Sequence, residues 1–300
     1  MRPRSFVATD VGVLVLTSVG RSVVGGTADG ELTAWDVDTA QSQWSTAIGQ
    51  MRELAVSASG HLVVAAYDGL VIVDPETGAV EQVPDSPERP ACIAAAGERT
   101  FWIGEFSGML HRLEIDGSGN PTMTSFFTDA SIETLVWTDA GLLTSGTQED
   151  VRLYASSSLE NPEPGMLFPT AQNSWHIQEG YGPPQVLISV SRGGWAVGGW
   201  SGELAMFTDV GDHEPVELHP QMGDTIVGLV EVQGSLFAAD AHGTVRQTSS
   251  DGPASLSEVP AGFRATSLCR LSDESIAVGG EDGIAIVDLD QTAQQSRRQT

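Results

Sequence analysis

The chain contains no lysine. All fourteen of its basic residues are arginine, against forty aspartates and glutamates, so its formal net charge is −26. Lysine is normally among the commonest residues of a globular protein. At molar salt the Debye length falls to about 3 Å, so crowded surface carboxylates barely repel one another, whereas in dilute buffer they destabilise the compact state. The composition therefore suits a protein that folds at high salt.

Long hydrophobic runs are also missing, and none approaches the roughly 18 residues of a membrane helix. The first segment, MRPRSFVATDVGVLVLTSVGRS, has two arginines close to its start, Arg2 and Arg4, and then a short apolar run. That run contains Asp10, and no small-residue cleavage site follows it cleanly, so we interpret it as a pair of strands rather than a signal peptide. We expect a cytoplasmic protein that does not enter a membrane.

Cysteine is scarce. Cys92 and Cys269 form neither a metal-binding box nor a Cys-x-x-Cys motif, so we expect free buried thiols.

One pattern recurs along the chain, and the stretch VVGGTADGELTAWD at residues 23–36 shows it. An apolar strand is followed by a small residue, a polar turn, a glycine and an alternating strand. Seven copies are found, and their anchor positions are Gly30, Gly69, Gly108, Glu149, Gly202, Gly243 and Gly283. The spacings are 39, 39, 41, 53, 41 and 40 residues. A period near 40 with about four short strands in each copy predicts a β-propeller.

A second regularity lies four residues before each anchor, where every copy has a small residue. These residues are Gly26, Ala65, Gly104, Ser145, Gly198, Ala239 and Gly279. Adjacent propeller blades pack closely near the axis, and a large side chain there would overpack by about 1–3 kcal/mol. A phosphate-binding glycine loop is excluded by context, because no helix follows that could present its N-terminus to an anion.

The predicted fold class is all-β: a seven-bladed propeller of four-stranded antiparallel blades, formed as one domain over residues 1–290. The last copy ends without a good outer strand, whereas RSFVAT near the start is one. We expect that N-terminal strand to complete the seventh blade and so remove an exposed sheet edge. Residues 291–300, which include Arg297 and Arg298, are expected to form a flexible C-terminal tail. Cys92 and Cys269 fall on innermost strands of blades three and seven, too far apart for a disulfide.

The segment DGELTAWDVDTAQSQWSTAIG resembles a repeat of the pyrroloquinoline-quinone-like propellers, and Trp35-Asp36 equally resembles the end of a WD repeat. IVDPETGAV fits the same template. Together with its acidic, lysine-free composition, the chain resembles propeller proteins of haloarchaea. Quinone-dependent enzymes of this kind usually have eight blades, a calcium site and an export signal. This chain has seven copies, and its asparagines are only at 120, 161 and 173, in predicted loops. The resemblance therefore assigns no catalytic residue of these enzymes to this chain, and we expect no cofactor.

A metal-dependent hydrolase or lactonase is the alternative. Asp29, Asp68 and Asp282 each precede an anchor glycine in neighbouring blades, and three carboxylates at one channel mouth could hold a divalent cation. Asp-Gly is also a common tight-turn dipeptide, which is the simpler explanation. The six histidines show no metal-ligand spacing, and we identify no catalytic residue or metal ligand.

The sequence gives stronger indications of a surface that binds a partner than of a catalytic site. Tyr67, Phe106 and Trp200 place large aromatic side chains in turns that are small and polar in most copies. Glu105 and His242 belong to the same set of turns and complete a candidate partner-binding face. Aromatic residues suit binding hot spots because they bury a large area at little entropic cost.

A second candidate is the long interval between copies four and five, an excursion over residues 156–185. It is rich in proline and carries Phe168, Trp175 and Tyr181. Either it packs back on the disc or it offers a docking segment.

The sequence thus favours a non-catalytic propeller scaffold that binds a protein partner in a halophile cytoplasm. Nucleic-acid binding has no support, although net charge alone does not exclude it where most proteins are acidic.

Overall fold

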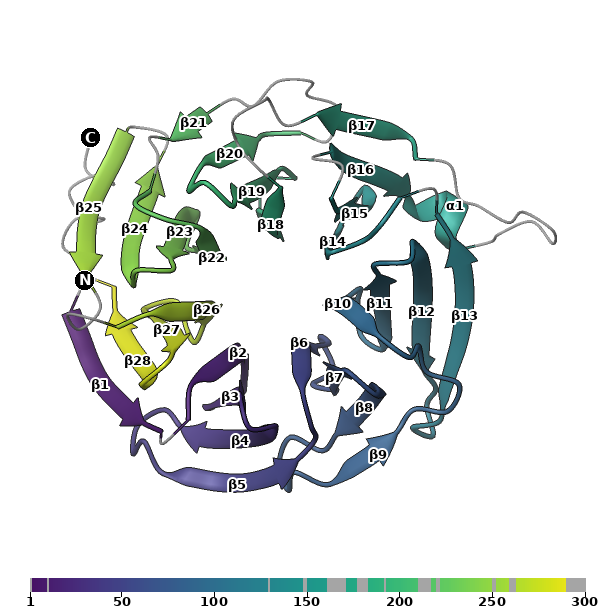
Figure 1. The fold of residues 1–300 in the computed structure, drawn as a ribbon, viewed down its shortest axis with the longest axis horizontal. Helices are drawn as coiled ribbons and strands as arrows, with labels where there is room; N and C mark the ends of the chain where they lie inside the picture. Colours follow the sequence, from purple (N-terminus) through teal and green to yellow (C-terminus); the bar gives the residue numbers. More distant parts are fainter. Residues whose placement is uncertain are drawn as a thin grey trace.

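The computed structural model describes residues 2–9, 11–128, 130–147, 150–160, 171–176, 183–191, 193–209, 217–219, 222–249, 252–258 and 263–289. Seven four-stranded antiparallel sheets stand in a ring around a central channel (Figure 1). The predicted fold class, a seven-bladed β-propeller, is confirmed. Among the described residues the only helix is α1 (Ser156–Glu160), and no helix there is long and apolar enough to cross a membrane.

In blades one to six the strands follow the chain from the channel outward, and in blade seven the outermost strand is β1. Blade one holds β2 (Val13–Val19), β3 (Ser22–Thr27), β4 (Glu31–Asp36) and β5 (Ser42–Ala47). Blade two holds β6 (Met51–Val56), β7 (Leu62–Ala66), β8 (Gly69–Val73) and β9 (Val80–Gln82). Blade three holds β10 (Pro90–Ala95), β11 (Thr100–Glu105), β12 (Met109–Ile115) and β13 (Pro121–Phe127). Blade four holds β14 (Thr134–Thr138), β15 (Gly141–Ser145), β16 (Asp150–Ala155) and β17 (Asn173–His176).

The remaining blades repeat this order. Blade five holds β18 (Pro184–Ser189), β19 (Trp195–Gly199), β20 (Leu204–Phe207) and β21 (Glu217–His219). Blade six holds β22 (Ile226–Val232), β23 (Ser235–Asp240), β24 (Thr244–Ser249) and β25 (Gly252–Glu258). Blade seven holds β26 (Ala265–Arg270), β27 (Ser275–Gly280), β28 (Gly283–Asp288) and β1 (Arg2–Ala8).

The ring closes through the N-terminal strand, as predicted. β1 pairs antiparallel with β28, with Phe6 opposite Ala285, and so supplies the outermost strand of blade seven (Figure 1). On the inner side, the Thr266 hydroxyl of β26 donates a hydrogen bond to the Val13 carbonyl of β2. Blades seven and one are therefore joined both by sharing the chain and by a direct bond at the hub.

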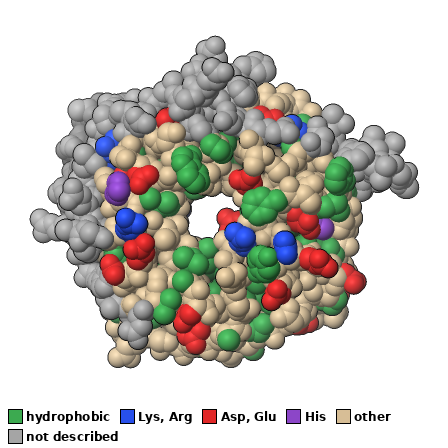
Figure 2. Space-filling model, viewed as in Figure 1, with side chains coloured by type: hydrophobic (Ala, Val, Ile, Leu, Met, Phe, Trp, Pro, Cys, Tyr) green, Lys and Arg blue, Asp and Glu red, His purple; other side chains and the backbone are tan. Residues whose placement is uncertain are grey.

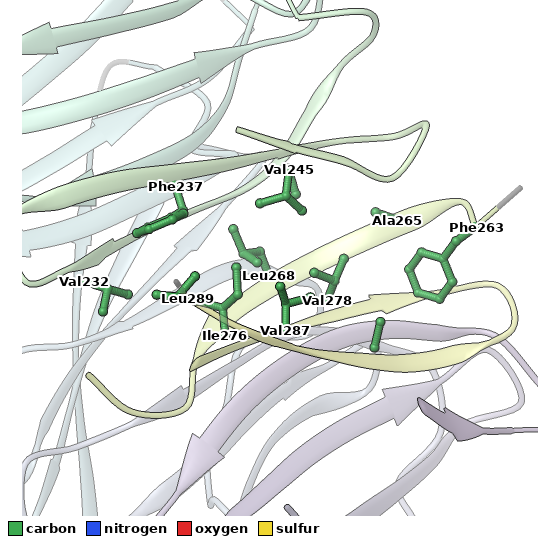
Figure 3. Packing of buried hydrophobic residues seen from close by; sticks show 12 residues of the cluster. Val232, Phe237, Val245, Phe263, Ala265, Leu268, Ile276, Val278, Val287 and Leu289 are labelled. Atoms are coloured by element: carbon green, nitrogen blue, oxygen red, sulfur yellow. The ribbon is translucent and has the colours of Figure 1, made fainter. Parts of the chain in front are cut away.

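The hydrophobic core is divided among the seven interfaces between adjacent sheets, with one cluster in each. Figure 3 shows the wedge between blades six and seven, where Phe237 and Val245 of one sheet face Leu268 and Val278 of the next. Both faces of each sheet are covered by neighbouring sheets. This explains why the second and third strands of a blade are hydrophobic runs rather than strict alternations, as in β7 (LVVAA).

The small residues before the anchors face large apolar side chains of the next blade. A Cβ on Gly26 would lie 2.8 Å from the Met51 sulfur, one on Gly198 would lie 2.6 Å from Ile226, and one on Gly279 would lie 2.9 Å from Leu16. Each of these neighbours lies on the first strand of the following blade. The predicted packing role of this position is confirmed where these glycines occur.

The anchor glycines are needed for two reasons. Six of the seven anchors are glycine, and all six have φ between 81° and 134°, a region that L residues rarely occupy. Most of them also touch the chain that enters the next blade. A Cβ on Gly108, for example, would lie 2.8 Å from the Ala130 carbonyl oxygen.

We expect Gly108→Ala to destabilise the fold more than Gly119→Ala. Both glycines have nearly the same φ, 86° and 88°, but a Cβ on Gly119 would meet nothing within 4 Å. The strained φ costs each variant about 1 kcal/mol, and crowding adds about 1–3 kcal/mol at Gly108 only. Urea denaturation measures both losses, and equal losses would show that the close approach at the anchor does not matter.

Candidate functional site

One face of the disc is formed by the turns between the second and third strands of each blade and by the connections between blades. We call it the turn face. Figure 2 shows this face, with arginine and large hydrophobic side chains beside the mouth of the central channel. It carries the predicted residues Tyr67, Glu105, Phe106, Trp200 and His242, because each follows or ends the second strand of its blade.

The channel mouth on this face is shaped by β-bulges. Six of the seven innermost strands (β2, β6, β10, β18, β22 and β26) have a register shift near their start. In each of them, one residue there has no partner on the second strand of its blade. Such bulges re-aim side chains and are common next to functional sites. The skipped residues are Leu14, Arg52, Ala91, Gln185, Val227 and Thr266. Arg52 is the only charged residue among them.

Two arginines lie over two of the predicted aromatic residues. The Arg52 guanidinium carbon lies 5.9 Å from the centre of the Phe106 ring, and that of Arg89 lies 5.1 Å from the centre of the Tyr67 ring. Both pairs bridge blades two and three, and both distances suit a cation–π interaction. We call Arg52, Tyr67, Arg89 and Phe106 the mouth patch.

The turn that carries Phe106 is fixed by a hydrogen-bonded network. Oε1 of Glu105 lies 2.8 Å from Nε2 of the buried His111, and Oε2 accepts a hydrogen bond of 2.7 Å from the Ser107 hydroxyl. Nδ1 of His111 lies 2.9 Å from the Ser125 hydroxyl. Glu105 therefore positions Phe106, which is itself 50% exposed.

Trp200 and His242 lie farther round the turn face, on blades five and six. Trp200 is 59% exposed, and its backbone is held by the Thr225 hydroxyl, which donates to its carbonyl over 2.8 Å. His242 lies 3.3 Å from the Asp224 carboxylate. Blade four separates Trp200 from Phe106 (Figure 1), so the three aromatics lie on one face without forming one cluster.

Part of the long interval between copies four and five belongs to a blade. Trp175 belongs to β17, the outer strand of blade four, where it faces Val151 of β16. It is 3% exposed and packs against Trp195, with ring centres 5.3 Å apart. Trp175 is thus part of the core between blades four and five. Phe168 and Tyr181 lie outside the described residues.

The three carboxylates of the predicted cation site do not converge. In the described ranges, no three histidine, cysteine, aspartate or glutamate side chains are placed to hold a metal ion, and this includes Asp29, Asp68 and Asp282. Asp29 accepts a hydrogen bond of 2.5 Å from the Thr27 hydroxyl within its own turn.

The cysteines lie where the sequence predicted, on β10 and β26, and both are buried free thiols. Burial raises the pKa of Cys269 to about 12. Burial and then the nearby Glu53 charge raise the pKa of Cys92 well above its ordinary value. Neither thiol is a nucleophile at neutral pH.

Glu53 is a partly buried carboxylate between two innermost strands. It lies on β6, and its Oε2 accepts a hydrogen bond of 2.7 Å from the Ile93 amide of β10. Burial raises the pKa of Glu53 from 4.5 to about 7, although the Ile93 hydrogen bond opposes the shift. An acid whose pKa is raised by folding binds more protons when folded, so its ionisation weakens the fold as pH rises from about 4.5 to 7.

We expect Glu53→Gln to stabilise the protein at pH 8 by about 1–3 kcal/mol and to have little effect at pH 5. The amide oxygen keeps an acceptor for Ile93 but cannot ionise. Urea denaturation at both pH values and constant KCl measures the effect. Glu81→Gln removes an exposed carboxylate from the same blade and is the control. A gain that is the same at pH 5 and pH 8 would contradict the assignment.

A shallow hollow of about 620 Å³ lies on the opposite face, between the outer parts of blades two and three. Its lining includes Ile72, Val80 and Ile115, with His61 and Glu76 among the polar residues. Val80 is among the exposed large hydrophobic residues.

No protein-family model matches the chain, and no curated protein matches it. The resemblance to WD and pyrroloquinoline-quinone-like repeats therefore stays a prediction, and the site rests on the geometry above. Arg52 and Arg89 are not predictable as a pair from the sequence, because they lie 37 residues apart and reach their aromatic partners only when two blades pack.

Proposed function

We propose that this protein is a non-catalytic propeller scaffold that binds a protein partner through its turn face. The observation that carries the proposal is the mouth patch, in which an exposed phenylalanine, a half-buried tyrosine and two exposed arginines lie between blades two and three. Tyrosine, tryptophan and arginine are the residues enriched at binding hot spots, and charged residues other than arginine are depleted there. Trp200 extends the same composition to blade five.

The shape of the surface favours a protein over a small molecule. Small ligands bind in concave sites that enclose most of their surface. Phe106 and Trp200 are instead half-exposed or more on an open face. Side chains held this way, with their backbone turns fixed by Glu105 and Thr225, are ordered before binding, which lowers the entropic cost of association.

We also propose a halophile cytoplasm as the working environment. The support is compositional: the absence of lysine and a net charge of −26. The mouth patch is consistent with it, because arginine stacked on an aromatic ring gains attraction that depends less on long-range charge than an exposed ion pair does.

Replacing both Tyr67 and Trp200 by alanine is expected to abolish capture of the partner from a lysate of the source organism in molar KCl. The loss of the half-buried Tyr67 and the exposed Trp200 should cost at least about 2 kcal/mol of binding free energy. Affinity capture with the full chain as bait measures it. Thermal unfolding of the bait checks that the fold is intact.

Val80→Ala is the matched control, because it removes an exposed hydrophobic side chain from the opposite face. It should capture the partner as the wild type does. Capture that survives loss of Tyr67 and Trp200 but fails in Val80→Ala would move the binding site to the hollow between blades two and three and overturn the turn-face assignment.

The melting temperature is expected to rise steeply as KCl increases from 0.1 M to about 1 M, because screening removes repulsion among the surface carboxylates. Differential scanning calorimetry measures it. Sodium and potassium chloride at equal ionic strength should act alike over this range if screening is the cause. A melting temperature that is flat in salt would contradict the high-salt environment.

A further inference from the structure

We infer that Arg52 and Arg89 bind carboxylates of the partner, so that the occupant of the mouth patch is an acidic protein segment. This rests on the proposed function, because it names the chemistry of the partner at the same face.

Both arginines lack an acidic partner, although the chain is very acidic. In the part of the chain that the structure describes, neither Arg52 nor Arg89 makes an ion pair. Five other described arginines do, and their partners are near them in the fold. These pairs are Arg21–Asp38, Arg112–Glu114, Arg152–Asp150, Arg264–Glu281 and Arg270–Asp273. The chain has forty carboxylates, and none of those in the described residues lies within ion-pair distance of the Arg52 or Arg89 guanidinium.

In blade seven, the arginine at the position equivalent to Arg89 does have an acidic partner. Arg89 directly precedes the innermost strand of blade three, and Arg264 directly precedes that of blade seven. Phe106 and Glu281 both follow the second strand of those blades. In blade seven the arginine lies 3.9 Å from the glutamate. In blade three an aromatic residue stands in place of the glutamate, and Arg89 lies over Tyr67 of the neighbouring blade.

In the described part of the chain, neither the Arg52 nor the Arg89 guanidinium donates a hydrogen bond, so their donors are available. A guanidinium donates in its own plane and can hold a carboxylate through two parallel N–H···O bonds. A guanidinium held beside an aromatic ring by a cation–π contact keeps its N–H donors for other acceptors. Two such groups, both at the interface of blades two and three, offer two binding positions for carboxylates on the turn face.

The charge of the chain favours an acidic protein segment over a nucleic acid as the anionic partner. Nucleic acid binds through many phosphate contacts along a basic track, and two arginines on a chain of net charge −26 supply no such track. At molar salt, repulsion between an acidic partner and the rest of the surface is screened within about 3 Å. Short-range arginine–carboxylate contacts then remain to specify the partner.

The test measures binding of a fluorescein-labelled twelve-residue peptide of alternating glutamate and alanine to the full chain by fluorescence anisotropy, from 0.3 to 2 M KCl. The glutamine counterpart and a twelve-nucleotide single-stranded DNA are the comparison probes. Arg52→Gln and Arg89→Gln should each weaken binding of the acidic peptide about tenfold. The double variant should abolish it. Arg264→Gln, the matched control at the equivalent position of blade seven, should leave it unchanged.

Three results would overturn the inference. The acidic peptide and its glutamine counterpart could bind equally, the double variant could bind as the wild type does, or the DNA could bind more tightly with the same dependence on arginine. Self-association of the wild type that the double variant abolishes would replace the partner by a second copy of this chain.

Partner capture separates this inference from the proposed function. If the Tyr67/Trp200 double variant loses the partner while the Arg52/Arg89 double variant keeps it, the turn face binds protein but not through carboxylates. If all four side chains can be removed without loss of capture, the proposed function itself fails.

Discussion

The structure depends on how closely adjacent sheets approach one another at the hub. Near the channel, a residue without a large side chain on the second strand of one blade faces an apolar side chain on the first strand of the next, as Gly198 faces Ile226 and Gly279 faces Leu16. The contact brings adjacent sheets close together at the hub, where the ring of seven blades must close. The core is accordingly seven thin wedges rather than one central mass. Many globular domains pack their buried side chains in one central core, whereas here the packed core surrounds an open channel (Figure 2).

The same constraint creates the candidate site. Blades that converge at the hub bring side chains of one sheet over the turn of the next, so Arg52 of blade two reaches Phe106 of blade three, and Arg89 reaches back to Tyr67. A bulge at the start of β6 takes Arg52 out of the ladder, and the Glu105–His111 pair fixes the Phe106 turn. The site is therefore built from parts that also serve the fold.

Much of the fold could be predicted from the sequence because its causes are local and repeated. Glycine at the anchor positions indicates a positive φ, and the small residues before the anchors indicate that adjacent sheets approach closely. The seventh copy has no good outer strand, whereas the N-terminal segment has one more strand than its blade needs, and this predicts that β1 closes the ring. The candidate site could be predicted only in part. Tyr67, Phe106 and Trp200 stand out as large residues in turns that are otherwise small, but their arginine partners come from other copies and meet them only through the packing of blades. Trp175 was placed in an excursion because β17 has one large apolar residue in four, NSWH, too weak a pattern to separate a strand from a loop.

The pairing of β1 with β28 has a consequence for how the chain is made. β1 is synthesised before β2, whereas its partner β28 is synthesised after β27, so the strands of the other six blades are made while β1 has no ladder to join. Until then both β1 and the outer edge of β28 are open to pairing with other chains. Nascent chains held at high local density would exchange these strands between neighbours, so the closing strand is where domain-swapped assemblies of this protein would begin.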